Sequence, residues 1–142
     1  MALFQRRGTD ESLPRSDRGR GSLDDYAFDL LPRNARITMT LAASDPCQDE
    51  LRAVLEAGDE ELETAMSART IEQERVDAPL EVRLFTGRRV SGVVGMIPRG
   101  LESVIDETLR RLEDRGDKPR IPVRITGRDG AHRVELLMGR TR

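Results

Sequence analysis

The residue types that most often carry catalysis and metal binding are scarce in this chain. Its 142 residues include one cysteine, one histidine and no tryptophan. A hydrolytic triad needs a nucleophile, a base and an orienting group, and the single histidine, His132, stands beside a predicted turn. A metal site needs several His, Cys or carboxylate ligands at suitable spacing. We therefore expect a protein that is not an enzyme, with no catalytic residues, no metal and no cofactor.

Disulfides, membrane spans and targeting signals are lacking as well. Cys47 has no second cysteine to pair with, so nothing indicates an oxidising compartment. No apolar run approaches the roughly 18 residues that span a bilayer, and the start of the chain lacks the apolar stretch of a secretory signal. We expect a soluble, cytoplasmic protein with no membrane partner and no evident small-molecule substrate.

Charge is abundant but unevenly distributed. The net charge is −2, whereas residues 1–22 carry +2, residues 23–81 carry −10 and residues 82–142 carry +6. The basic last part could bind a polyanion, or the acidic and basic parts could attract each other within one fold. The sequence leaves both interpretations open.

Composition separates a leader from a folded part. Residues 1–22 are rich in Gly, Ser, Arg and Asp and have almost nothing to bury, which predicts a disordered leader. Over residues 23–142 the apolar residues recur periodically, and we expect a single α+β domain. Aromatic residues make up 3% of the chain, so its core must be aliphatic. The first part of this domain, 23–79, is acidic, and the second part, 80–142, is basic.

The segment 23–31 has apolar residues at helical spacing. It is either a short helix packed on the domain or a peptide that docks on a protein partner. In the second case, the partner-binding residues would be Leu23, Tyr26, Leu30 and Leu31. After this segment, residues 36–41 alternate between apolar and polar side chains, which predicts a half-buried strand.

The best helix signal covers residues 45–58. Asp45 can cap the amide end of the helix, and Gly58 can end it. The apolar stripe of this helix consists of Cys47, Leu51, Val54 and Leu55. Because Cys47 lies on this stripe, we expect it to be a thiol in the core. Residues 59–67 predict a second helix that opens with acidic side chains. Residues 68–78 could continue that helix or pass into a strand.

The last third alternates between strand and helix patterns. They first predict a strand over residues 80–84, a turn over 86–89 and a returning strand over 90–97. A helix over residues 101–116 follows, and then two further strands over 121–126 and 133–138. Gly92 and Gly95 indicate a bulge or bend in the returning strand. The expected fold is α+β: a small antiparallel sheet, ββ-α-ββ in this part, packed with two or three helices.

Arginines on the turns and strands of this last third are the one feature that points to a ligand. If they lie on one surface, they can contact the phosphates of a nucleic acid. These candidate residues are Arg88, Arg89, Arg99, Arg120, Arg124, Arg128 and Arg133. Base stacking would need aromatic side chains, and only Phe85 is nearby.

A short motif runs through the same region. It consists of Gly87-Arg88 at a turn, then Val94-Gly95-Met96-Ile97-Pro98, then the helix that begins at Leu101. Over residues 80–138 this arrangement resembles the HIRAN-like domain family. That family usually has an Asn-Pro-x-Asp segment shortly before the Gly-Arg turn, whereas here Asp45-Pro46 stands much earlier and opens a helix. The resemblance implies a small β-rich module, and better-characterised members recognise DNA ends.

Two functions follow from these features. The first is a small non-catalytic binding module that associates with nucleic acid through a basic C-terminal face. The alternative is a protein-interaction adaptor, in which the leader and residues 23–31 contact a protein partner.

Overall fold

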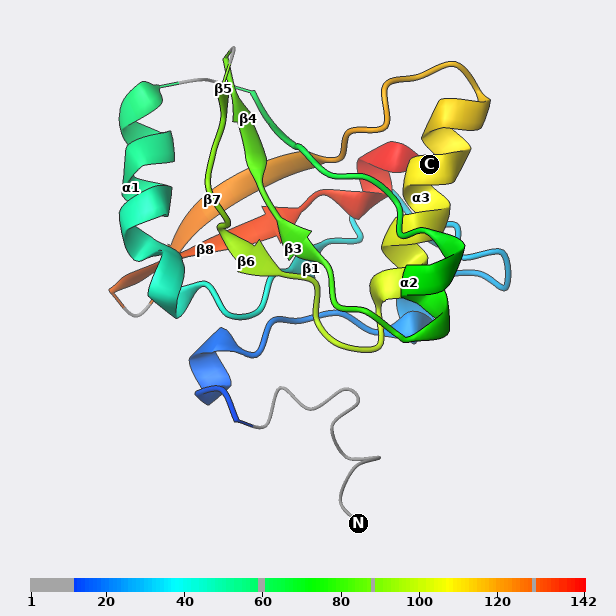
Figure 1. Cartoon of the computed structure of the whole chain (residues 1–142), viewed down its shortest axis with the longest axis horizontal. Coiled ribbons are helices and arrows are strands. Elements are labelled where there is room, and N and C mark those ends of the chain that lie inside the picture. Colours follow the sequence, from blue (N-terminus) through cyan, green and yellow to red (C-terminus); the bar gives the residue numbers. More distant parts are fainter. Residues whose placement is uncertain (1–11, 59–60, 88, 129) are drawn as a thin grey trace.

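Antiparallel strands and helices form the α+β fold that the sequence predicts. The computed structural model describes residues 12–58, 61–87, 89–128 and 130–142, and within them it has eight strands and three α-helices (Figure 1). The strands are β1 (Met39–Thr40), β2 (Leu62–Thr64), β3 (Glu81–Val82), β4 (Leu84–Thr86), β5 (Arg89–Val90), β6 (Gly95–Met96), β7 (Pro122–Arg128) and β8 (Ala131–Leu136). The α-helices are α1 (Gln48–Ala57), α2 (Ile71–Arg75) and α3 (Glu102–Asp114).

The strands form a large and a small sheet that are joined to each other. Within the described residues, six strands follow the order β1-β8-β7-β2-β4-β5, all antiparallel, and β3 pairs with β6. Only Arg83 separates β3 from β4. Just beyond β1, the backbones of Ala42 and Met96 exchange two hydrogen bonds of 2.8 Å. The strands therefore form a nearly closed ring around the core.

The core inside this ring is mainly aliphatic, as the scarcity of aromatic residues predicts. Helix α1 contributes Leu51 and Val54, and the buried side chains of α3 include Val104, Ile105 and Leu109. In Figure 1 these two helices lie at opposite ends of the strand layer. Full burial of one such side chain stabilises the fold by about 1.5–3 kcal/mol, so packing against the strands holds both helices in place.

The C-terminal hairpin has the strands and the alternation that the sequence predicts. Strands β7 and β8 pair without interruption from Val123 opposite Leu136 to the hairpin turn. Val134 and Leu136 are fully buried, whereas Arg124 is exposed. Because successive side chains point to opposite faces of a sheet, the face of this hairpin opposite to the core is polar.

The strand predicted over residues 90–97 is interrupted. Its first part, β5, pairs with β4, and its second part, β6, pairs with β3 in a register that differs by two residues. The surplus residues between β5 and β6 form a bulge, as the glycine at position 92 indicates. The Gly92 amide donates a hydrogen bond of 2.7 Å to Glu50 Oε1 on α1, which ties the bulge to that helix.

The helix predicted over residues 59–67 is wrong. Residues 59 and 60 lie outside the described residues, and residues 62–64 form β2 between β4 and β7. Thr64 is buried, and its Oγ1 accepts a hydrogen bond of 3.0 Å from the Ile121 amide. Local helix propensity is a weak preference, and pairing with two neighbouring strands outweighs it.

The segment that the sequence leaves undecided, residues 68–78, contains helix α2. Thr70 and Gln73 form a capping box, in which each side chain accepts a hydrogen bond from the other residue's amide. The box starts a helix of only five residues. The choice between helix and strand is therefore decided by a local cap.

The helix predicted over residues 45–58 is confirmed, but its start differs. Gly58 ends α1 in the left-handed conformation with a φ of 75°. Asp45 lies in a 3-10 helix, Asp45–Cys47, and its side chain does not cap α1. Leu51 and Val54 are buried as predicted, whereas Leu55 is 43% exposed.

Residues 23–31 do not form the short helix that is one of the two predicted alternatives. Leu23–Asp25 form a 3-10 turn, and a tight loop follows that is closed by a bridge between Tyr26 and Pro32. Leu30 has a φ of 63°, a conformation that an α-helix does not contain. Tyr26, predicted to contact a partner, is instead 3% exposed and packs in the core. The residues predicted beside it, Leu30 and Leu31, are half-buried, and Leu23 is exposed.

Candidate nucleic-acid interface

A buried carboxylate holds residues 12–22 against the domain. Asp17 Oδ1 accepts a hydrogen bond of 2.7 Å from the Ser44 amide, and its Oδ2 accepts one of 2.9 Å from the Asp45 amide. These amides open the 3-10 helix that leads into α1, where a negative charge is favourable. The prediction of a disordered leader is therefore wrong for residues 12–22. Residues 1–11 of that leader lie outside the described residues.

The same carboxylate forms a buried ion pair with Arg133 of β8. Arg133 Nη1 lies 2.7 Å from Asp17 Oδ1, and its Nη2 lies 2.7 Å from Asp45 Oδ1. The side chains of Asp17 and Arg133 are 1% and 6% exposed. Further along, the backbones of Arg20 and Thr40 exchange hydrogen bonds of 3.0 and 2.9 Å. Arg20 thus adds one isolated bridge to the edge of β1.

We expect Asp17→Asn to release residues 12–22 from the domain. The substitution removes one of the two carboxylate charges that Arg133 pairs with, and a hydrogen bond to a charged group contributes about 1.5–3 kcal/mol. Trypsin cleavage after Arg18 and Arg20 measures the release, and its rate should rise about tenfold or more. Asp24→Asn, an exposed carboxylate in the next turn, is the control and should cleave as the wild type does. Unchanged cleavage of Asp17→Asn would contradict the anchoring role.

A polar groove of about 310 Å³ lies between residues 15–20 and the strands β1, β7 and β8. Arginine and hydroxyl side chains dominate its lining, which consists of Arg15, Ser16, Gly19, Arg20, Thr38, Thr40, Thr126, Gly127, Arg133 and Glu135. Gly19 has a φ of 77°, and a Cβ there would lie 2.6 Å from the Thr40 carbonyl oxygen. Glycine at this position therefore lets the segment approach β1 closely.

The positive charge of this groove comes from Arg15 and Arg20. Both are exposed, and among the described residues no acidic side chain lies within ion-pair distance of either. The groove's acidic residue, Glu135, pairs with Arg124 at 2.8 Å. Arg133 is neutralised by its two aspartates. The groove can thus offer two exposed cations and several hydroxyl donors to an anion with many oxygens.

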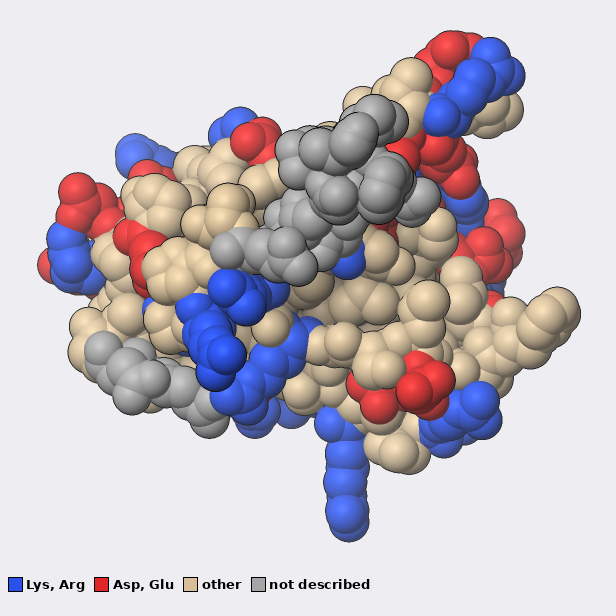
Figure 2. All heavy atoms as spheres, turned by 90° about the horizontal axis from the view of Figure 1, so that it is seen from below, with Lys and Arg blue, Asp and Glu red and all other residues tan. Residues whose placement is uncertain are grey.

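A second depression, of about 350 Å³, lies on the other side of residues 18–21. Its basic lining residues are Arg18, Arg20 and Arg99. Seen from the side on which residues 12–22 lie, Lys and Arg side chains gather in one part of the surface (Figure 2). Arg15, Arg18 and Arg20 of the N-terminal segment line the groove and the second depression.

Two of the arginines predicted to bind nucleic acid belong to internal ion pairs. Arg133 forms the buried floor of the groove, so it is not part of an exposed basic surface. Arg99 lies 3.0 Å from Asp77 and 2.8 Å from Glu102, and its side chain is 18% exposed. Both guanidinium groups are held by carboxylates, which leaves them little charge to offer to a phosphate.

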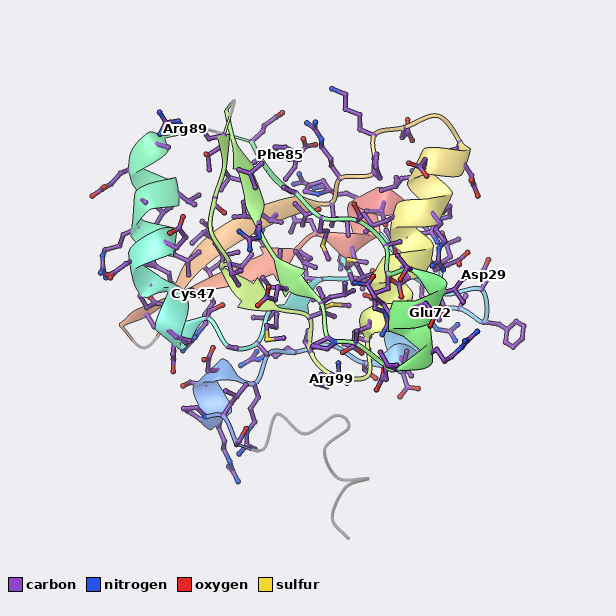
Figure 3. The ribbon with its side chains drawn as sticks, in the orientation of Figure 1. Asp29, Cys47, Glu72, Phe85, Arg89 and Arg99 are labelled. Atoms are coloured by element: carbon purple, nitrogen blue, oxygen red, sulfur yellow. The ribbon has the colours of Figure 1, made fainter. Side chains whose placement is uncertain are left out.

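The other predicted arginines are spread over the molecule. Arg124 lies on the polar face of the C-terminal hairpin, beside the groove, whereas Arg89 is on β5 at the edge of the sheet. Arg120 stacks over the Phe85 ring at 4.1 Å from its centroid; Figure 3 labels Phe85 and Arg89 in this region. Arg88 and the side chain of Arg128 lie outside the described residues. The predicted arginines that are described do not converge on one surface.

Ion pairs connect the acidic and basic parts of the chain. Carboxylates of residues 23–81 meet arginines of residues 82–142 at 2.7–3.6 Å in the pairs Asp77–Arg99, Glu74–Arg110, Glu63–Arg120 and Asp45–Arg133. In a fifth pair the arginine, Arg69, belongs to residues 23–81 and the carboxylate, Asp106, belongs to residues 82–142. Attraction between the acidic and basic parts is therefore present in the fold, and it engages these four arginines of residues 82–142.

Arg15 and Arg20 are not among the candidate binding residues that the sequence predicts, because the Gly- and Ser-rich composition of residues 1–22 predicts a disordered leader. The signal that could have found them is the pair Gly19 and Gly21 around Arg20, both with positive φ. Such glycines also mark a close approach between backbones. Composition alone does not distinguish that arrangement from a linker.

The chain's single cysteine, Cys47, lies in the 3-10 helix before α1. Burial raises the pKa of the Cys47 thiol, and the nearby Asp17 and Glu50 raise it further, so the thiol stays protonated at neutral pH. No group of three or more His, Cys, Asp or Glu side chains in the described ranges could hold a metal ion. None of the described helices combines the length and the apolar character needed to cross a bilayer.

Comparison with known proteins adds no assignment. No family model matches this chain, and neither does any curated protein or solved structure.

Proposed function

We propose that this protein is a small, non-catalytic module that binds nucleic acid through the groove between residues 15–20 and strands β1, β7 and β8. The observation that carries the proposal is the combination of two exposed arginines, Arg15 and Arg20, with hydroxyl side chains in one groove. Arginine side chains neutralise phosphates, and hydroxyl groups and backbone amides bind phosphate oxygens.

A chain of phosphates suits this surface better than a single small anion. The groove and the second depression share Gly19 and Arg20, so basic residues follow one another along both sides of one segment. The groove is lined by no aromatic side chain among the described residues, which removes the usual platform for base stacking. We therefore expect contacts to the backbone with little sequence preference.

The resemblance of residues 80–138 to the HIRAN-like family supports the same class of ligand. Better-characterised members of that family recognise DNA ends. The groove, however, is formed mainly by residues 15–20 and by strands outside the motif that carries the resemblance. Recognition of DNA ends is thus a separate question from binding of the backbone.

The test is binding of the purified chain to a labelled single-stranded DNA of about 20 nucleotides at about 50 and 200 mM salt. We expect binding that weakens steeply with salt. The double variant Arg15→Glu/Arg20→Glu should weaken binding at least tenfold at the lower salt and reduce the salt slope by about 1.4, since each phosphate contact on a single strand contributes about 0.7.

The matched control is Arg52→Glu/Arg75→Glu, which makes the same charge change on α1 and α2. Both arginines are exposed and form surface ion pairs of little energetic weight. A groove interface predicts near wild-type binding for this control. If both double variants lose DNA affinity equally, the net charge of the protein explains the effect and the groove does not. If the wild type does not bind at the lower salt, the proposal is excluded. Competition by circular single-stranded DNA, which has no ends, shows whether ends are recognised.

A further inference from the structure

An exposed aromatic ring lies at the tip of the loop of residues 26–32, which is closed by backbone hydrogen bonds. The side chain of Phe28 is fully exposed, at 104% of its reference area. Isolated apolar residues on a surface are ordinary, but this loop is held rigidly. Ala27 and Leu31 are joined by a hydrogen bond of 2.8 Å, and Arg33 donates one of 3.0 Å to the Asp25 carbonyl oxygen.

The loop is preorganised at some conformational cost. Leu30 has a φ of 63°, which is unfavourable for a residue with a Cβ. The Leu31 amide donates a hydrogen bond of 3.2 Å to Asp29 Oδ1, and the buried Tyr26 anchors the loop in the core. A side chain presented on such a loop loses little freedom when it enters a binding pocket.

The same chain has an open pocket that can take such a ring. The pocket has a volume of about 480 Å³ and lies where residues 65–67, strands β4 and β5 and residues 118–120 meet. Its apolar walls include Met66, Phe85 and Val90, and Val90 on the edge strand is 52% exposed. One Phe ring would leave part of this volume to neighbouring residues of its loop.

Charge distinguishes the two surfaces. Residues 23–31 carry three acidic side chains, Asp24, Asp25 and Asp29, and no basic one. The pocket carries Lys118 in its lining, and Arg120, which also lies 3.6 Å from Glu63. An acidic loop with an aromatic tip and an apolar pocket with a basic rim are complementary in charge and in apolar character.

We propose that Phe28 of one copy of this chain inserts into the Phe85–Val90 pocket of a second copy. In Figure 3, Asp29 lies at one end of the molecule, whereas Phe85 and Arg89 lie on another side. A loop therefore meets the pocket of a different copy, and in a pair joined by one such contact, one copy keeps a free loop and the other a free pocket. Such head-to-tail contacts produce rings or open chains.

This inference does not rest on the proposed function. The loop and the pocket share no residue with the groove that holds Arg15 and Arg20. A contact made by one loop is smaller than the roughly 1,200 Å² of a standard interface, so we expect weak association. The association should be measured at protein concentrations up to about 1 mM, because a complex with a Kd of about 1 mM is roughly half formed there.

The experiment is sedimentation equilibrium on the full chain and two variants. Phe28→Ser removes the ring that inserts, and Val90→Asp places a charge in the pocket. Both positions are exposed, so neither change removes core packing. We expect concentration-dependent association of the wild type and at least a tenfold weaker association of each variant alone.

Mixing the two variants gives the decisive result. Phe28→Ser retains the pocket and Val90→Asp retains the loop, so an equimolar mixture should associate again but stop at a dimer. Leu55→Ser, an exposed apolar residue on α1, is the control and should behave as the wild type. A wild type that is monomeric at the highest concentration, or a mixture that stays monomeric, would overturn the proposal. Phe28 would then have no role in contacts between copies of this chain.

Discussion

Replacing Asp106 by Asn is expected to destabilise the fold by about 3–5 kcal/mol, the usual cost of removing one partner from a buried ion pair. Asp106 on α3 is 1% exposed, and Arg69 is 4% exposed. The Asp106 carboxylate accepts hydrogen bonds from the Arg69 amide at 2.7 Å and from its Nε at 2.8 Å. Without this charge, the ion pair left to the buried guanidinium among the described residues is a longer contact of 3.5 Å with Asp77, beside a hydrogen bond of 2.9 Å from its Nη1 to the Ala78 carbonyl oxygen.

Burial opposes the charge of Arg69, but the hydrogen bond and the charge of Asp106 more than compensate, and the pKa of Arg69 is raised. The guanidinium therefore stays charged and needs its carboxylate. Urea unfolding followed by circular dichroism measures the loss of stability, provided that the m-value is unchanged. A loss below about 1 kcal/mol would contradict the buried pair.

Two controls separate the ion pair from simple damage to α3. Glu107→Gln removes an exposed carboxylate at the next position and should change stability by no more than about 0.5 kcal/mol. Replacing both partners, in Arg69→Met/Asp106→Leu, should recover much of the loss because apolar side chains of similar size can substitute for a buried pair.

A second large effect is expected at Gly139, in the 3-10 helix Met138–Thr141 that ends the chain. A Cβ on Gly139 would overlap the carbonyl group of Ala35. Because that neighbour is backbone, no side-chain rotation can relieve the overlap. Gly139→Ala should therefore separate the terminal turn from residues 35–37 and break the hydrogen bond of 2.8 Å from Gly139 to the Ile37 carbonyl oxygen.

We expect Gly139→Ala to destabilise the protein by about 4 kcal/mol or more, a size that single substitutions seldom reach. The matched control is Gly127→Ala in β7, where a Cβ would have no atom within 4 Å. This control should unfold within about 1 kcal/mol of the wild type. Thermal unfolding of the two variants gives the comparison, and equal midpoints would show that the terminal turn does not pack closely against residues 35–37.

The candidate site shows where reasoning from the sequence reached its limit. Charge counting identified the asymmetry between the two parts of the chain, but not which arginines remain available. Arg133, predicted to face a ligand, is buried by Asp17, a residue 116 positions away in the sequence. Arg15 and Arg20, which line the groove, belong to a segment whose composition predicts disorder. Both errors have one cause, because partners distant in sequence leave no local pattern.

The sequence by itself determined the elements whose signal is local. The alternation in β7 and β8, the apolar face of α3 and the helix end at Gly58 each depend on residues within a few positions of one another. Periodicity and caps act over that range, so they can be recognised without the fold. The α+β class follows from the order of these elements.

Tertiary structure alone decided the rest. Residues 62–64 became a strand because β4 and β7 offer hydrogen bonds on both sides, and residues 12–22 became ordered because Asp17 finds two amides and a guanidinium. Local preferences of this kind amount to about 1 kcal/mol per residue or less. Contacts between distant segments exceed that amount, and they form only when the whole chain is folded.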